Sequence, residues 1–384
     1  MPRKVCVVVT ARPSYSRIKT ALRAIQEEPG LELQLVVAAS ALLDRYGTAV
    51  QYIEQDGFDI AARVYMVLEG ANPASMAKTT GLGLLELATA FDNLKPDVVV
   101  TIADRYETLA TAVAASYMNI PVAHVQGGEV TGSIDEKVRH AVTKLSNLHF
   151  VATKKAAQRV LQMGEERSTV FVTGCPSIDL AAEVLRDPTL NFDPFEKYGG
   201  VGERPNLSNG YLVVMQHPVT TEYEQARGHV LETLSAVENV DVPTLWFWPN
   251  VDAGSDGTSN GIRSFRERHT PAKLHFFKNM APADFLRLLL NAQCLIGNSS
   301  VGIRESSFLG VPVVNIGSRQ AGRERAANVI DVGYDRIQIR EAIECHGRNG
   351  RYENDRLYGD GKAGERIAGI LTTAPLRIEK RLAL

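Results

Sequence analysis

Acidic side chains gather in one short stretch, HVQGGEVTGSIDE (124–136). The stretch follows an apolar run, so Glu129, Asp135 and Glu136 are expected just past the carboxyl end of a strand. Asp104 also follows such a run. Carboxylates that lie close together favour proton transfer, because like charges raise one another's pKa. The alternative for Asp104 and Asp135 is that each caps the helix that follows it.

The stretch GNSSVGIRE (297–305) predicts an anion site. Ser299 and Ser300 stand between an apolar run and a helix, so their hydroxyls and the helix N–H groups suit a phosphate. Glu305, one turn into the helix, is placed to accept hydrogen bonds from a ribose diol. Arg319 follows the next apolar run and adds positive charge.

Two further positions fit phosphate chemistry. Arg12 and Ser16 lie where the first apolar run passes into a helix, although Ser14 or Ser16 could simply cap that helix. His217 follows an apolar run in the second half, where it would donate to a phosphate or protonate a leaving group. A buried structural histidine is the alternative. The chain has no G-x-G-x-x-G turn and no P-loop, so a dinucleotide site is not predicted.

Composition excludes several classes of protein. Of 384 residues, 45% are hydrophobic and 22% charged, and the net charge of -2 predicts no nucleic-acid or anionic-membrane partner. No apolar run approaches the ~18 residues that span a bilayer. The run at 5–10 leads straight into Arg12 and Pro13, which favours a core strand over a signal peptide. Four widely separated cysteines and eight scattered histidines predict a reducing cytoplasm and no metal site.

Short apolar runs alternate with helical stretches, which predicts parallel sheets covered on both faces. The runs are 5–10, 33–39, 97–103, 121–126, 149–153, 170–174, 211–218, 244–250, 274–279, 294–300 and 312–317. Residues 191–210 are rich in glycine, proline and asparagine and predict a linker. The predicted fold is α/β with two Rossmann-like doubly wound domains, 1–195 and 205–384. The final helix, about 362–372, fits either domain and could pack back on the first. Ligands bind at the carboxyl ends of such strands, so the site is expected in the interdomain cleft.

Several ordered motifs resemble those of the hydrolysing UDP-N-acetylglucosamine 2-epimerases, which feed sialic-acid-type biosynthesis. The resemblance covers nearly the whole chain. The matching motifs are IEQDGFDI (53–60), DRYE (104–107), GGEVTGSIDE (127–136), RHAVTKL (139–145), TGCPSID (173–179), QHPVTTE (216–222), PNVDAGS (249–255), GNSSVGIRE (297–305) and NIGSRQAGRE (315–324).

The resemblance implies a glycosyltransferase-B-like fold and hydrolysis of UDP-N-acetylglucosamine to UDP and N-acetylmannosamine. A base would remove the C2 proton while UDP leaves C1, giving a 2-acetamidoglucal to which water adds. The implied catalytic residues are Asp104, Glu129, Asp135 and His217. The implied substrate and UDP contacts are Arg12, Ser16, Arg105, Gln126, Asn250, Met280, Ser299, Ser300, Glu305 and Arg319. The resemblance implies no metal and no cofactor, and a cytoplasmic homodimer or homotetramer.

Three departures from the family pattern leave alternatives open. Some relatives carry Glu at Gln126, and an amide cannot be the base there. Ile102 and Ala103 replace a His-Gly pair. The region around Asn279 does not match the feedback site of animal members, so no such inhibition is predicted. The alternatives are the same chemistry on a UDP- or GDP-linked 2,4-diacetamido-2,4,6-trideoxy sugar, a non-hydrolysing epimerase, a transferase of the same fold, and a non-catalytic sensor.

Overall fold

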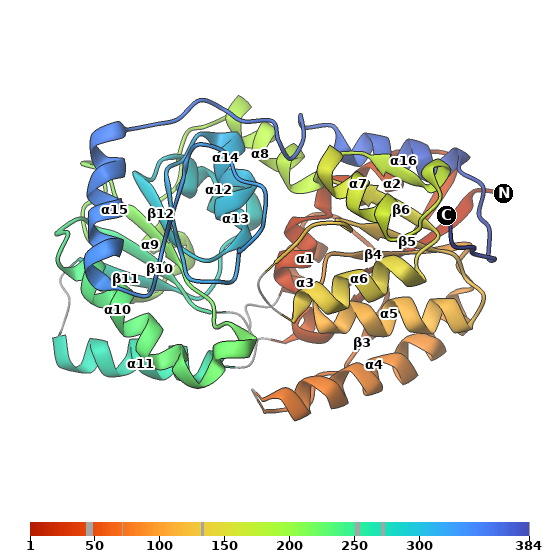
Figure 1. The fold of residues 1–384 in the computed structure, drawn as a ribbon, viewed down its shortest axis with the longest axis horizontal. Helices are drawn as coiled ribbons and strands as arrows, with labels where there is room; N and C mark the ends of the chain where they lie inside the picture. Colours follow the sequence, from red (N-terminus) through yellow and green to blue (C-terminus); the bar gives the residue numbers. More distant parts are fainter. Residues whose placement is uncertain (44–48, 71, 132–133, 250–253, 270–272, 384) are drawn as a thin grey trace. The chain divides into compact units, whose positions relative to one another are not determined.

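The computed structural model describes residues 1–43, 49–70, 72–131, 134–249, 254–269 and 273–383, and these form two compact units (Figure 1). Unit 1 consists of Met1–Glu129, Ile134–Leu180 and Tyr358–Leu384. Unit 2 consists of Val130–Ser133 and Ala181–Leu357. The structure therefore draws the boundary near residue 180 rather than near 200, and it assigns the final helix to unit 1.

Unit 1 is built on a seven-stranded parallel sheet in the order β3-β2-β1-β4-β5-β6-β7. The strands are β1 (Arg3–Val9), β2 (Leu31–Ala38), β3 (Ile60–Val64), β4 (Val98–Ile102), β5 (Val122–Val125), β6 (Leu148–Val151) and β7 (Val170–Val172). The order reverses between β1 and β4. In open α/β sheets such a reversal marks the place where loops diverge and leave room for a ligand.

Both faces of this sheet are buried, as the apolar runs predict. Along β1, Val5, Val7 and Val9 enter one hydrophobic cluster, while Cys6 and Val8 enter the cluster on the other face. Helices α2 (Lys19–Glu27) and α16 (Ala363–Thr373) cover the first face, and α4 (Pro73–Leu94), α5 (Tyr106–Tyr117) and α6 (Asp135–Leu145) cover the second. The expected helix from about residue 14 is two helices, because α1 (Arg12–Ser16) ends before α2 begins.

The C-terminal helix α16 is tied into unit 1 and lies beside α2 (Figure 1). Asp179 in α8 (Pro176–Arg186) accepts hydrogen bonds from the backbone of Ala363 at 2.9 Å and Gly364 at 2.7 Å. Gly364 approaches α2 so closely that a Cβ there would lie 2.8 Å from the Thr20 carbonyl carbon. Burial raises the pKa of Asp179 to about 6, although these hydrogen bonds oppose that shift.

Unit 2 repeats the architecture of unit 1. Its sheet has the order β14-β13-β12-β9-β10-β11-β8, and all pairs except β11 with β8 are parallel. The strands are β8 (Val201–Gly202), β9 (Leu212–Met215), β10 (Thr244–Phe247), β11 (Leu274–Phe277), β12 (Cys294–Gly297), β13 (Val313–Ile316) and β14 (Val329–Val332). The order reverses between β9 and β12, which occupy the positions of β1 and β4 in unit 1. Two Rossmann-like α/β units are thus present, as expected.

The expected linker at 191–210 is partly ordered secondary structure within unit 2. It contains α9 (Pro194–Tyr198) and β8, which pairs antiparallel with β11. His275 on β11 bonds the carbonyls of Gly199 at 2.9 Å and Glu203 at 2.8 Å. Backbone pairing of this kind leaves no apolar periodicity in the sequence, which explains the wrong prediction.

The remaining described elements connect the strands. They are α3 (Ala49–Gln55), α7 (Lys154–Gln162), α10 (Ala226–Glu238), α11 (Ser255–His269), α12 (Pro282–Leu290), α13 (Ser300–Ile303), α14 (Glu305–Leu309) and α15 (Arg336–Asn349), with 3-10 turns at Ala39–Leu42, Arg167–Thr169 and Thr220–Gln225. Among the described residues, no helix is both long and apolar enough to cross a membrane.

Candidate active site

Asp104 lies directly after β4, on a turn that the neighbouring strand holds in place. Ala103 has a φ of 63°, a left-handed conformation that a residue with a side chain seldom adopts. His124 on β5 fixes this turn, because its Nε2 bonds the Ala103 carbonyl at 2.8 Å and its Nδ1 lies 3.1 Å from the Thr143 hydroxyl. Burial lowers the pKa of His124 to about 3, so the ring is neutral and structural. Strain of this kind is commonest at functional sites.

Arg139 on α6 is the centre of the acidic group and is fully buried. Its guanidinium pairs with Asp104, donates to the Glu129 carbonyl at 2.9 Å and contacts Glu136 at 3.0 Å. Burial opposes its charge, but the attraction of Asp104, Glu129 and Glu136 outweighs burial and raises the pKa of Arg139 above its usual value. One cation therefore holds the Asp104 carboxylate, the Glu136 carboxylate and the Glu129 backbone together.

The capping alternatives for Asp104 and Asp135 do not hold. The N-cap of α5 is Arg105, and the N-cap of α6 is Ile134, so neither aspartate occupies a cap position. Asp135 is the first residue of α6 and is partly exposed, whereas Glu129 is buried. The structure thus places Asp104 and Glu129 in the loops that follow β4 and β5, and Asp135 at the start of α6.

Gln126 and the two glycines after it form a tight turn at the end of β5. Gln126 is buried with a φ of 69°, and its amide nitrogen donates to the Cys175 sulfur at 2.8 Å. A Cβ on Gly127 would lie 2.9 Å from His124, and one on Gly128 would lie 2.3 Å from the Ala156 carbonyl oxygen. Packing within unit 1 therefore already requires both glycines, whether or not a ligand approaches them.

The expected phosphate contacts of unit 1 differ in their surroundings. Arg12 begins α1 after the Ala11 N-cap, and burial lowers its pKa to about 10. Ser16 lies inside α1 rather than capping it, and its hydroxyl donates to the Pro13 carbonyl at 3.0 Å. Arg105 turns toward the fully buried Glu107, with both nitrogen–oxygen distances at 3.2 Å. A phosphate at Arg105 would therefore compete with Glu107.

In unit 2, the loops after β9 and β12 are joined side by side at the reversal of strand order. The Asn298 side chain accepts a hydrogen bond from the His217 backbone N–H and donates one to the His217 carbonyl, each at 2.8 Å. His217 itself is buried. Asn298, which immediately precedes Ser299 and Ser300, thus fixes the backbone of His217, the histidine that is expected to face a phosphate.

The serine pair lies at the start of α13, as expected, but the helix breaks at Arg304 and continues as α14. Ser299 is the N-cap of α13, and the Ser300 hydroxyl accepts a hydrogen bond at 2.9 Å from the buried Arg304. Glu305 begins α14, and its buried Oε2 lacks a hydrogen-bond partner among the described residues. That oxygen lies 4.0 Å from Arg304 Nε.

The other expected nucleotide contacts are less uniform. Arg319 is partly exposed and donates to the Asn298 carbonyl at 3.3 Å. Met280 is buried, and its backbone N–H already donates to the Asn279 side chain at 2.8 Å, so a nucleotide would have to displace that bond. Asn250 lies outside the described residues.

Comparison with known proteins identifies the family. The family model for UDP-N-acetylglucosamine 2-epimerase matches residues 23–372. The chain is 34% identical over 380 residues to the UDP-N,N'-diacetylbacillosamine 2-epimerase (hydrolyzing) of Legionella pneumophila, covering 98% of this chain and 97% of that protein. The chain belongs to the UDP-N-acetylglucosamine 2-epimerase family. The family expected from the sequence motifs is thereby confirmed.

Other members of the epimerase family support the same assignment. The UDP-N-acetylglucosamine 2-epimerase of Neisseria meningitidis is 28% identical, covering 97% of this chain and 95% of that protein. The fold also matches that of the Methanocaldococcus jannaschii UDP-GlcNAc 2-epimerase, crystallised with UDP-GlcNAc and UDP. The TM-score is 0.79 at 20% identity, covering 96% of this chain and 99% of that one. The predicted glycosyltransferase-B-like fold class is confirmed.

Sequence reasoning did not assign roles to Arg139, Asn298 and Arg304. Arg139 stands four residues after Asp135 and Arg304 four after Ser300, so helical spacing could have placed each pair on one face. The Asn298–His217 contact joins residues 81 apart, and nothing in the sequence marks it.

Proposed function

We propose that this epimerase-family member is a hydrolysing 2-epimerase that releases UDP from a UDP-linked 2-acetamido sugar. A carboxylate takes the C2 proton, the C1–oxygen bond to UDP breaks, and a C1–C2 double bond forms. Water then adds its hydroxyl to C1 and a proton returns to C2 on the opposite face. The observation that carries the proposal is that Arg139 holds the Asp104 and Glu136 carboxylates and the Glu129 backbone together beyond β4 and β5.

The carboxylates of unit 1 supply the proton chemistry in this proposal. Asp104 is ion-paired with the buried Arg139, which fixes the position of its carboxylate. Glu129 and Asp135 are the other candidates for the C2 base. Gln126 has no basic group and is assigned to hold the substrate.

Unit 2 supplies the nucleotide site in this proposal. The N-terminus of α13, with Ser299 and Ser300, would face the phosphates, and Arg319 and His217 would neutralise the leaving UDP. The Glu305 Oε2, which has no hydrogen-bond partner in the part of the chain that the structure describes, would accept hydrogen bonds from the ribose hydroxyls, since a buried acceptor is costly to leave unbonded. In this proposal, side chains and helix N–H groups supply the positive charge that stabilises the leaving UDP, so that no metal ion is needed.

Two sugars are candidates. UDP-N-acetylglucosamine is the substrate in the name of the matching family model. UDP-N,N'-diacetylbacillosamine, a 2,4-diacetamido-2,4,6-trideoxy sugar, is favoured by the name of the relative at 34% identity. Both carry the 2-acetamido group and the C2 proton, and they differ only at C4 and C6.

The test is incubation with each nucleotide sugar in deuterated water, followed by NMR. Free UDP and a 2-epimerised free sugar carrying deuterium at C2 are expected. An intact UDP-sugar deuterated at C2 would instead indicate a non-hydrolysing epimerase. No turnover of either sugar, with GDP-linked sugars also inert, would refute the proposal and favour a transferase or a sensor. Size-exclusion chromatography with light scattering tests the proposed homodimer or homotetramer.

A further inference from the structure

Asn298 connects three loops at the carboxyl edge of the unit 2 sheet. Its side chain forms two hydrogen bonds with the His217 backbone in the loop after β9. Its own carbonyl accepts from Gln320 at 2.8 Å and from Arg319 at 3.3 Å, both in the loop after β13. Strands β9, β12 and β13 are neighbours in the sheet, so one residue sets the relative placement of three adjacent strand ends.

The close approach of these loops is built into the backbone. The Asn298 N–H donates to the Met215 carbonyl at 3.1 Å. Gly297 has a φ of 128°, and a Cβ there would lie 2.2 Å from the Met215 carbonyl oxygen, so a side chain would drive the loops apart. Asn298 is fully buried. It therefore acts on a ligand only through the residues that it holds.

We propose that Asn298 is the positioning residue of the nucleotide site, which it assembles by aligning His217, Ser299 and Arg319 on one phosphate group. This inference rests on the proposed function only in taking these three residues as the phosphate contacts. It assigns their alignment to one buried amide that does not touch the nucleotide.

The chemistry of an amide explains why asparagine suits this position. The His217 backbone presents one donor and one acceptor, and the carboxamide of asparagine, on its short side chain, forms a hydrogen bond with each. Alanine would leave two buried backbone groups without partners, and aspartate would set a second oxygen against the His217 carbonyl. The loop after β9 would then be free to shift relative to the serine pair.

The chain offers a matched control at the opposite edge of the same sheet. Asn328, just before β14, is also buried. It accepts from the Ser307 hydroxyl at 2.9 Å and donates to the Val311 carbonyl at 2.7 Å. Asn328→Ala, like Asn298→Ala, removes one accepted and one donated side-chain hydrogen bond, the accepted one coming here from a hydroxyl rather than a backbone N–H, and it lies away from the carboxyl ends of the strands. The two variants separate a loss of stability from a loss of alignment.

The experiment is calorimetric titration of the full-length variants with UDP, well below their melting temperatures. We expect Asn298→Ala to weaken UDP binding at least about tenfold, the effect of losing a buried hydrogen bond, and Asn328→Ala to leave it within about twofold. Uridine, followed by ligand-observed NMR, should bind both variants as it binds the wild type, because it lacks the phosphates. Equal weakening of UDP by both variants, or equal weakening of UDP and uridine by Asn298→Ala, would overturn the inference.

A milder variant keeps the test decisive if Asn298→Ala does not fold. Gln320→Met keeps the Asn298 side chain and removes the bond to the Asn298 carbonyl, together with the hydrogen bond that Gln320 accepts from Arg323 at 3.0 Å, so a smaller weakening of UDP binding, about threefold, is expected. No weakening would contradict the role of Asn298 in aligning the third loop. If the wild type binds only GDP, GDP with guanosine replaces UDP with uridine. Wild-type binding without turnover of any sugar would refute the proposed reaction alone, whereas no binding of either nucleotide would refute both proposals.

Discussion

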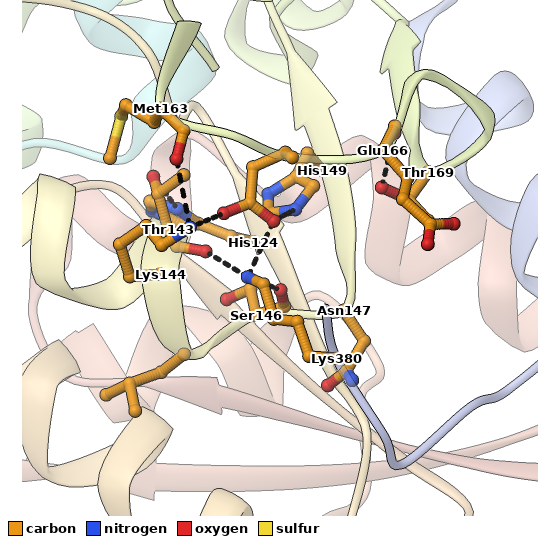
Figure 2. A network of polar contacts seen from close by, with 12 residues as sticks. His124, Thr143, Lys144, Ser146, Asn147, His149, Met163, Glu166, Thr169 and Lys380 are labelled. Atoms are coloured by element: carbon orange, nitrogen blue, oxygen red, sulfur yellow. Dashed lines mark hydrogen bonds and ion pairs between the residues drawn. The ribbon is translucent and has the colours of Figure 1, made fainter. Parts of the chain in front are cut away.

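Unit 1 contains two buried charge clusters of opposite composition. At the carboxyl edge of the sheet, one cation, Arg139, contacts Asp104 and Glu136 and the Glu129 backbone. Before β7, at the opposite edge, one acid, Glu165, meets Lys144 at 2.7 Å, His149 at 2.9 Å and Lys380 at 2.6 Å. These three partners of Glu165 are labelled in Figure 2. The first cluster has more acids than bases, and the second has more bases than acids.

The difference separates a chemical role from a structural one. The first cluster brings carboxylates to the carboxyl ends of strands, where ligands bind in folds of this class, whereas the single acid of the second cluster is held by three basic side chains. Burial opposes the charge of Glu165, but hydrogen bonds from His149, Lys144 and Lys380 outweigh burial and lower its pKa to about 2. Lys380 also donates to the carbonyls of Thr143 and Ser146 (Figure 2), so this cluster fastens the C-terminal segment to unit 1.

The largest effects are expected at the acid-rich cluster. Asp104→Asn and Asp135→Asn should each lower turnover at least ~100-fold, because acid–base participation is worth that much. Glu129→Gln should be comparably severe if Glu129 is the C2 base. UDP affinity, measured by calorimetry, should stay near the wild-type value in all three. Near-normal turnover in both aspartate variants would contradict a catalytic role for the cluster around Arg139.

Glu165→Gln should reduce stability without reducing turnover. We expect a loss of about 2 kcal/mol at pH 7, measured by urea unfolding, because the buried cations lose their counter-charge. The folded-state pKa lies below the ordinary 4.5, so the stabilisation is present above that pH and disappears as the pH falls toward 2. The gap between wild type and variant should close over the same range. A gap that does not depend on pH would show that Glu165 does not act through its charge.

The two lysines around Glu165 should differ in their contributions. Lys380→Met should cost about 1 kcal/mol, because Lys380 is largely buried and has two further carbonyl partners. Lys144→Met should cost no more than about 0.5 kcal/mol, because 40% of its side chain is exposed. Thermal unfolding of both variants at neutral pH measures the difference. Equal costs would contradict the role of Lys380 in fastening the C-terminal segment.

The smallest effect concerns backbone strain at the edge away from the acids. Lys95 follows α4 with a φ of 48° and is exposed, so Lys95→Gly should stabilise unit 1 by about 0.5 kcal/mol. Turnover should not change, because this turn precedes β4 rather than following it. A fall in turnover would show that the backbone conformation at Lys95 also affects the active site.

Sequence reasoning placed the elements that carry chemistry because buried parallel strands are continuous apolar runs. It therefore put Asp104, Glu129, His217 and Ser299 at strand ends. It missed the edge strands β3 and β14, which are only partly buried. The sequence also does not show why Gly127 and Gly128 are glycines, since His124 and Ala156 occupy the space where side chains at these positions would lie.

Contacts between distant residues were beyond sequence reasoning. The pairing of Arg139 with Asp104 depends on how α6 packs against α5 and β5, and the bonds of Asn298 depend on two loops 81 residues apart. Neither leaves a periodic pattern. Which residues hold the site residues in place therefore became visible only in three dimensions.

The Asp179 contact that holds the start of α16 has a consequence for biosynthesis. Because α16 completes unit 1, and its residues are translated after all of unit 2, the ribosome releases a whole unit 2 while unit 1 still lacks one of its covering helices. The nascent chain is therefore expected to fold its middle before its beginning. Until α16 docks, the face of the first sheet that binds it remains exposed to chaperones.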